Sequence, residues 1–288
     1  MAMKENLRTL LGAGWLGWQM EANWTDPFLF LVYSVAKPVS GALILVFMYI
    51  VILGGVATER TAFAYIFLGN AFFIYVGQVL FGVTWVIHED REHFQTLKLI
   101  YISPISFYYY IIGRAGSKIL IATIAVVVTL LFGVFVLGIP MDAFTVDWGL
   151  LILCLTVGMA CLVSIGIALA GITFLTAKHS GGINEGIAGL FYVFCGVVFP
   201  ITQLPAWGQS LGYAIPVTYW LEAMRRALVP EFQTQDLVIT GMAGTSNFWL
   251  VALLAVSALF FYFLSILIFR LGDYLARRAG KIDMTTAY

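Results

Sequence analysis

The chain alternates long apolar stretches with short polar joints. Six intervals of more than 20 residues contain no charged residue; they cover positions 38–58, 61–88, 119–141, 148–177, 186–221 and 237–269. A helix rises about 1.5 Å per residue, so roughly 20 apolar residues cross a hydrocarbon core about 30 Å thick. The pattern predicts an all-α integral membrane protein with six transmembrane helices, at about 29–53, 61–87, 107–138, 148–176, 184–201 and 247–271.

Helices fit the pattern better than the strands of a barrel, which alternate over about ten residues. Residues 151–175, LILCLTVGMACLVSIGIALAGITFL, are apolar on every side. The composition agrees, because 61% of residues are hydrophobic and 10% are charged, against about 25% charged in soluble domains. The formal net charge is zero, so no overall field favours nucleic acid, and membrane lipid is the expected surrounding.

The basic residues are distributed unevenly between the two sets of joints. Twelve lie on the side of both termini: Lys4, Arg8, Lys37, Arg91, Lys98, Arg114, Lys118, Lys178, Arg270, Arg277, Arg278 and Lys281. Only Arg60, Arg225 and Arg226 fall on the other side. Because cytoplasmic joints are rich in Lys and Arg, we expect both termini, including a tail at 276–288, in the cytoplasm.

Residues 1–26 precede the first predicted span and carry a helical apolar stripe. Its members are Leu7, Leu10, Leu11, Gly14, Trp15 and Trp18. This spacing predicts an amphipathic helix in the inner membrane interface, joined to the first span; a simple tryptophan anchor is the alternative.

The joint at 88–104 is the most charged segment of the chain. His88, Glu89 and His93 resemble a zinc-protease motif, but the two histidines are five residues apart and would lie about 140° apart around a helix. A solvated charged helix is therefore the preferred interpretation, and we predict no metal site. Cys154, Cys161 and Cys195 all fall within predicted spans and are interpreted as buried packing residues.

Residues 196–229, around the joint 202–230 between the last two spans, stay apolar but cannot form one helix. Pro200, Pro205 and Pro216 interrupt them. Broken backbone at membrane depth is tolerated only where protein or a water-lined cavity shelters it, so we predict a re-entrant helical hairpin at the position of an outer gate.

Few polar residues occur inside the predicted spans. Asn70 and Gln78 are eight residues apart and share a helix face. They could form an interhelical hydrogen bond or line a wet pathway for substrate.

The chain lacks a Walker-type loop, a dinucleotide-binding fingerprint and a G-x-S-x-G elbow. No nucleophile and base are paired inside a span, so we predict no catalytic residue and no cofactor bound by this chain. An intramembrane enzyme acting on lipid or peptide, or a channel-like membrane protein, remains the alternative to a transporter.

Two joints resemble the permease subunits of the type-2 family of ATP-binding-cassette (ABC) exporters. Before the third span, that family has E-x-G-T-L-E and then [ST]-P-[IV]; the matching residues are Thr96, Leu97, Ser103, Pro104 and Ile105. Gln95 replaces the usual glycine, and Lys98 replaces the trailing acid. The second signature, G-[VI]-x-F-P-x-x-x-L-P-x-W with P-[LV]-T-Y and E-x-x-R, is matched by Gly196, Phe199, Pro200, Leu204, Pro205, Trp207, Pro216, Val217, Thr218, Tyr219, Glu222 and Arg225.

The resemblance implies a transporter membrane domain at 27–275 that exports an amphipathic or lipid-like small molecule or a glycan from the cell. It implies two copies of an ABC ATP-binding subunit that bind ATP and Mg²⁺, and a second copy of this permease or a homologous one. The residues expected to couple to the ATPase are Glu89, Asp90, Arg91, Glu92, Thr96, Leu97, Ser103 and Pro104. Those expected at the outer gate are Phe199, Pro200, Leu204, Pro205, Trp207, Pro216 and Thr218.

Overall fold

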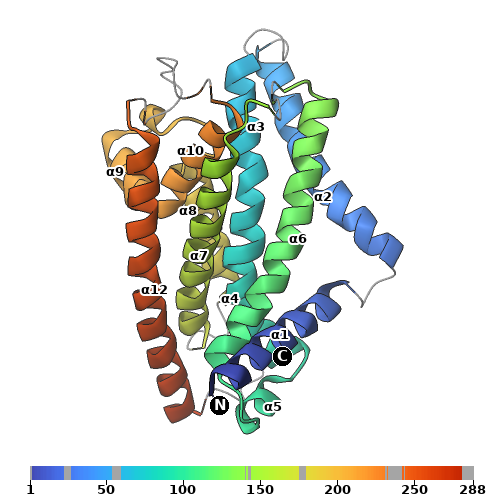
Figure 1. Cartoon of the computed structure of the whole chain (residues 1–288), viewed down its shortest axis with the longest axis vertical. Helices are drawn as coiled ribbons and strands as arrows, with labels where there is room; N and C mark the ends of the chain where they lie inside the picture. The colour runs from blue at the N-terminus through green and yellow to red at the C-terminus, as the bar shows by residue number, and fades with distance from the viewer. Residues whose placement is uncertain are drawn as a thin grey trace.

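A computed structural model describes residues 2–22, 27–53, 60–139, 141, 144–174, 180–230, 232, 242 and 244–280. Every regular element in these ranges is a helix, as Figure 1 shows, which confirms the predicted all-α fold class. Four helical stretches within them are long and apolar enough to cross a membrane: Ala62–His93, Phe107–Phe135, Trp148–Thr173 and Asn247–Arg278.

The first of these stretches is built from four consecutive helical segments. The helix α3 (Arg60–Tyr75) leads into the π-helical η1 (Val76–Phe81), then α4 (Gly82–His88) and the π-helical η2 (Glu89–His93). The predicted span 61–87 is therefore helical, but the helix continues to His93. The first part of the predicted coupling segment is thus the end of a spanning helix rather than a separate element.

Three further long helices complete the centre of the bundle: α6 (Phe107–Phe135), α7 (Trp148–Thr173) and α12 (Asn247–Arg278). Asp147 and Ser246 are the N-caps of α7 and α12, and their side chains accept hydrogen bonds from Leu150 N at 3.0 Å and Trp249 N at 3.4 Å. Such caps satisfy backbone N–H groups that the first turn leaves free. Polar residues next to apolar runs therefore fix where these two helices begin.

Two helices precede the bundle. The helix α1 (Ala2–Ala22) lies across one end of α6, and α2 (Pro27–Leu53) follows it (Figure 1). A Cβ at Gly14 would lie 3.2 Å from the backbone oxygen of Gly113, so the two helices touch through glycines. Of the predicted segment 1–26, residues Ala2–Ala22 form one helix. Lys37 was assigned to a joint, but it lies inside α2, whose backbone is helical through that position.

The described residues 180–230, which include the fifth predicted span and the joint after it, form four short helices. These are α8 (Ser180–Phe194), η3 (Ile201–Gln203), α9 (Ala206–Ala214) and α10 (Pro216–Leu228). The helix in the predicted span 184–201 ends at Phe194, and Gly196 follows with φ of +71°, a conformation that suits glycine. The polypeptide therefore turns before reaching position 201, earlier than the uncharged interval suggests.

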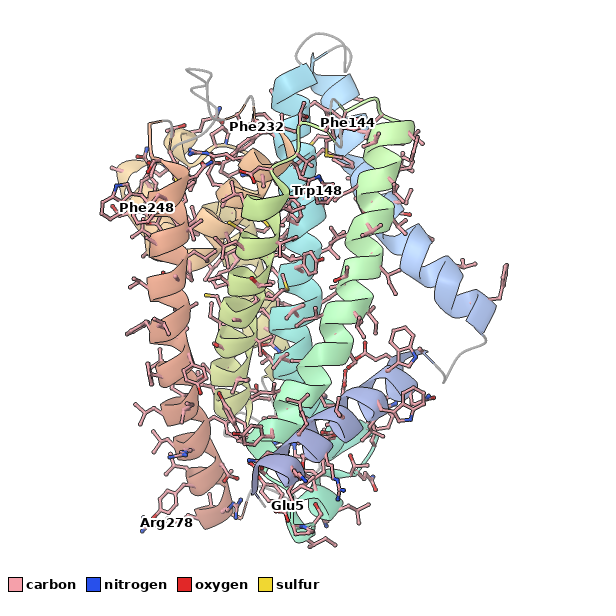
Figure 2. The ribbon with its side chains drawn as sticks, in the orientation of Figure 1. Glu5, Phe144, Trp148, Phe232, Phe248 and Arg278 are labelled. Carbon is pink, nitrogen blue, oxygen red and sulfur yellow. The ribbon has the colours of Figure 1, made fainter. Side chains whose placement is uncertain are left out.

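The bundle has two ends that carry different elements. The element α5 (Leu97–Ile102) and the crossing of α1 over α6 lie at one end, called here the α5 end. The helices α9 and α10 lie at the other, the α10 end. In Figure 2, Glu5 and Arg278 mark the α5 end, and Trp148, Phe232 and Phe248 mark the α10 end.

Candidate functional site

At the α5 end, the chain leaves a spanning helix and forms a short, separate one. The helix η2 ends at His93, Gln95 adopts φ of +52°, and α5 begins at Leu97. Ser103 is extended and its hydroxyl donates to the Ile100 carbonyl at 2.7 Å, which ends α5 before Pro104. The type-2 ABC exporter permeases, which the sequence resembles, have glycine at the position of Gln95. The backbone of Gln95 is left-handed, and glycine adopts that conformation at little cost.

Arg114 of α6 is the centre of a buried ion network at the α5 end. Its guanidinium donates to Asp90 Oδ1 at 3.0 Å and to Glu89 Oε2 at 3.0 Å, and the side chains of Arg114 and Asp90 are fully buried. The Tyr110 hydroxyl donates to Asp90 Oδ2 at 2.9 Å. Buried charges are tolerated only when they are paired and hydrogen-bonded. Here η2 supplies the two acidic residues, and α6 supplies the arginine and the tyrosine that bind them.

Lys118 extends the same network to α1. Its ammonium group forms ion pairs with Glu21 of α1 and, at 3.4 Å, with Glu89 Oε1. A Cβ at Gly17 would lie 3.1 Å from Cδ of Arg114, so α1 is packed closely against the same side chains. The network therefore joins α1, η2 and α6 into one unit at this end.

The predicted coupling residues mostly face this interior. Glu89 and Asp90 bind Arg114, the Arg91 and Glu92 side chains pair at 3.1 Å with little exposure, and Leu97 is 2% exposed. The Thr96 hydroxyl donates to Asp90 Oδ1 at 3.4 Å. Ser103 is half-buried and Pro104 is exposed. Most of these charges thus hold the segment in place rather than form its outer surface.

The outer surface of this segment is largely apolar. Leu99 is 61% exposed and Ile102 is 80% exposed, and they lie three residues apart on one face of α5. Phe94 and Ile105 are exposed on either side of α5. We call Phe94, Leu99, Ile102 and Ile105 the apolar tip. The hydrophobic pattern did not predict this surface, because it does not show that most of the charged residues around it turn inward.

A second polar contact joins α5 to α12. The Tyr101 hydroxyl donates to Asp273 Oδ1 at 2.6 Å, and Arg277 binds Asp273 Oδ2 at 3.1 Å. The Arg277 guanidinium carbon also lies 4.7 Å from the centre of the Tyr101 ring. Burial and the nearby Asp273 carboxylate raise the pKa of Tyr101, which keeps it a hydrogen-bond donor at neutral pH. No local motif predicts a contact between residues 172 positions apart.

At the α10 end, the predicted gate residues divide into buried supports and exposed ones. Pro216 begins α10, and the buried Thr218 hydroxyl donates to the Gly212 carbonyl at 2.7 Å, which fixes the turn from α9 to α10. Trp207 is 64% exposed and stacks edge-on against Phe194 at 5.7 Å between ring centres. The remaining predicted gate residues also differ in exposure: Pro200 is buried, Phe199 and Leu204 are half-buried, and Pro205 is exposed.

Three charged side chains of α10 are buried at this end. Arg226 Nε donates to Glu222 Oε1 at 2.9 Å, and the Arg226 guanidinium also reaches the carbonyls of Thr245 at 2.6 Å and Met242 at 2.8 Å. Arg225 donates to the Gly196 carbonyl at 2.8 Å. These bonds connect α10 to the turn after α8 and to the segment before α12, so α10 holds the elements of this end together.

The two polar residues of the second predicted span have different surroundings. The Tyr192 hydroxyl of α8 donates to Asn70 Oδ1 at 3.2 Å. Of the two roles predicted for Asn70, an interhelical hydrogen bond or the lining of a pathway, the structure shows the hydrogen bond. Gln78 is half-buried within η1.

The other candidate ligands are dispersed. His88 packs against Trp85 and His93 against Phe94, and the described residues contain no group of three or more metal-binding side chains. Cys154, Cys161 and Cys195 are buried free thiols, as predicted.

Long apolar helices, buried ion networks at both ends and an apolar tip define a multi-pass helical membrane protein. The ABC-2 type transporter family profile matches residues 14–229, which is most of the chain and includes α5 and α10. The chain therefore belongs to the ABC-2 type transporter family, which comprises membrane subunits of ABC transporters. No curated protein matches this sequence closely enough to add to that assignment.

Proposed function

We propose that this chain is the permease subunit of an ABC exporter. In this role it forms the substrate pathway and couples ATP hydrolysis by a partner ATPase to export of an amphipathic or lipid-like small molecule or a glycan. The observation that carries the proposal is the apolar tip, an exposed surface that follows η2, which Arg114 and Lys118 join to α6 and α1. A rigidly mounted apolar surface is suited to a protein partner, because displacement of the tip moves the helices behind it.

The membrane topology that we propose has six spans. The four long helices supply four of them, and α2 and α8 supply the first and fifth. The 15 residues of α8 reach only about 22 Å, short of the hydrocarbon thickness. We infer that α9 and α10 return through the remaining depth as a re-entrant hairpin, since the bonds of Arg225 and Arg226 shelter its broken backbone.

The orientation places the α5 end in the cytoplasm and the α10 end outside. Lys4, Arg8, Lys98, Arg277 and Arg278 are on elements that lie at the α5 end, which fits the rule for cytoplasmic joints. The cell membrane is the proposed location. The exposed side chains of Leu7, Leu11 and Trp15 on α1 then face the inner lipid interface.

The proposed complex contains two permeases and two ATP-binding subunits, with ATP and Mg²⁺ bound by the latter. Each apolar tip contacts one ATP-binding subunit. On the outer side, α9 and α10 act as the gate, and Trp207 is its most exposed large apolar side chain. Asn70 is assigned a structural role through Tyr192, so Gln78 is the better candidate of the two for lining the pathway.

The test is purification of the full chain with affinity-tagged ABC ATP-binding subunits from its own cell, followed by reconstitution into liposomes. The proposal predicts a stable complex whose ATP hydrolysis depends on the permease and is stimulated by one of the substrate classes. A chain that never retains an ATPase, but hydrolyses lipid or conducts ions alone, would instead be the intramembrane enzyme or the channel-like protein.

A further inference from the structure

The polar contact between α5 and α12 differs from the other attachments of the apolar tip. The ion network around Arg114 holds η2, which precedes α5, whereas Tyr101 is part of α5 itself. Its hydroxyl donates to Asp273 Oδ1 at 2.6 Å, and the Arg277 guanidinium binds both oxygens of that carboxylate at 3.1 Å. Because α5 has only six residues and is flanked by irregular backbone, this contact determines how α5 sits against α12.

The opposite end of α12 contacts the segment proposed to form the gate. Arg226 of α10 donates to the Thr245 carbonyl just before α12, and to Asn247 Oδ1 at 3.4 Å on its first residue. About 39 Å of continuous helix separates Asn247 from Asp273. As Figure 2 shows, α12 runs without interruption from the end marked by Phe248 to the end marked by Arg278.

Between these ends, α12 has no π-helical turn and packs along α7. Close to Asp273 the two backbones touch, because a Cβ on Gly171 would lie 2.9 Å from the Phe269 Cα. In contrast, the α3 to η2 helix contains two π-helical segments, where backbone hydrogen bonds are rearranged. The pair formed by α7 and α12 is thus the more regular connection between the ends of the bundle.

We propose that α12 carries the displacement of α5 to α10, and that Tyr101 and Asp273 are the positioning residues through which α12 follows α5. This inference rests on the proposed function, because the partner ATPase supplies the displacement. The Asp273 carboxylate receives a hydrogen bond from α5 and an ion pair from Arg277 on its own helix. Loss of a hydrogen bond to a charged group weakens such a joint by about tenfold.

The experiment uses the full complex of permease and ABC ATP-binding subunits in liposomes. Spin labels on Phe135→Cys at the end of α6 and Ser210→Cys in α9 report movement at the α10 end, since both positions are exposed. Labelled chain is diluted with unlabelled chain, and the distance is measured without nucleotide and with ATP and vanadate. The change on ATP binding is compared in the parent, Tyr101→Phe, Asp273→Asn and the double variant.

We expect Tyr101→Phe and Asp273→Asn each to reduce the ATP-dependent distance change at least about threefold while the ATPase still co-purifies. The double variant should lose no more than either single one, because both remove the same joint. Tyr274→Phe, which removes an exposed hydroxyl from the next residue of α12, should leave the change intact.

A full distance change in Tyr101→Phe and Asp273→Asn would overturn the inference, as would a parent complex that hydrolyses ATP without moving α9. Tyr101→Phe removes a single oxygen and keeps the ring, so it remains informative even if Asp273→Asn fails to fold. If no ABC ATP-binding subunit co-purifies with the parent chain, it is the proposed function that fails.

Discussion

The Arg225 guanidinium carbon lies 3.7 Å from the centre of the Tyr65 ring, so that a cation of α10 is stacked on an aromatic side chain of α3. The same guanidinium occupies the space beside Gly69, one turn along α3, where any side chain would overlap its Nη2 atom. A glycine in one helix thus admits an arginine from another. Without that gap, α10 could not carry Arg225 into contact with the Gly196 carbonyl.

Gly69→Ala tests this relationship. The added Cβ would displace Arg225 and lie 2.7 Å from the Val197 carbonyl oxygen, so we expect a loss of about 1–3 kcal/mol in stability. Thermal unfolding of the purified protein in detergent measures the change. Gly116→Ala in α6 is the matched control, since its Cβ would meet nothing within 4 Å, and helix propensity predicts no loss there. Equal melting temperatures for Gly69→Ala and the parent would contradict the assignment.

Gln95→Gly should stabilise the connection between η2 and α5. Gln95 has φ of +52°, a conformation that costs most residues about 1–2 kcal/mol and glycine very little. We expect a gain of about 1 kcal/mol in thermal unfolding, whereas Gln95→Val should lose stability. If valine were tolerated as well as glycine, the left-handed backbone at this position would be wrong.

Replacing Arg114 alone should destabilise the protein more than replacing Arg114 and Asp90 together. Arg114→Met leaves Asp90 buried without its cation, which predicts a loss of about 3–5 kcal/mol. Combining Arg114→Met with Asp90→Asn should recover part of that loss, because the stranded charge is gone. Yield of folded protein and thermal unfolding measure both. A double variant less stable than Arg114→Met alone would show that the two side chains do not form a pair.

Ile102→Asp should weaken binding of the ATP-binding subunit while leaving the fold intact. Ile102 is 80% exposed and belongs to the apolar tip, so a charge there is tolerated in water but not in an apolar interface. We expect at least a tenfold loss of affinity, measured by co-purification and by biolayer interferometry. Lys98→Asp places the same acid at a neighbouring exposed position outside the apolar tip and should have a smaller effect. Unchanged binding of Ile102→Asp would exclude the apolar tip as the contact surface.

Trp207→Ala should alter export without altering folding. Trp207 is largely exposed and contacts Phe194 at the edge of its ring, so its removal leaves the core untouched. If α9 forms the gate, transport by the reconstituted complex should change several-fold while ATPase binding remains. An export rate equal to that of the parent would place the gate elsewhere.

The hydrophobic pattern predicted the long helices well because uncharged intervals and helix lengths follow from the same membrane thickness. It did not predict that α8 ends at Phe194, since Gly196 and the prolines that end it are uncharged and leave the interval unbroken. It located the charged joint at Glu89 and Asp90 but not the direction of their side chains. That direction depends on Arg114, which lies 24 residues from Asp90 in the chain.

The apolar tip also has a consequence for a chain that has not yet met its partner. Leu99 and Ile102 project from the α5 end, and in the proposed orientation they are in the aqueous cytoplasm rather than in lipid. Exposed apolar patches of this kind promote non-specific association. An orphan permease would therefore be recognisable to chaperones and proteases by the same surface that it uses for assembly. Cells that make both subunits in matched amounts would keep that surface covered.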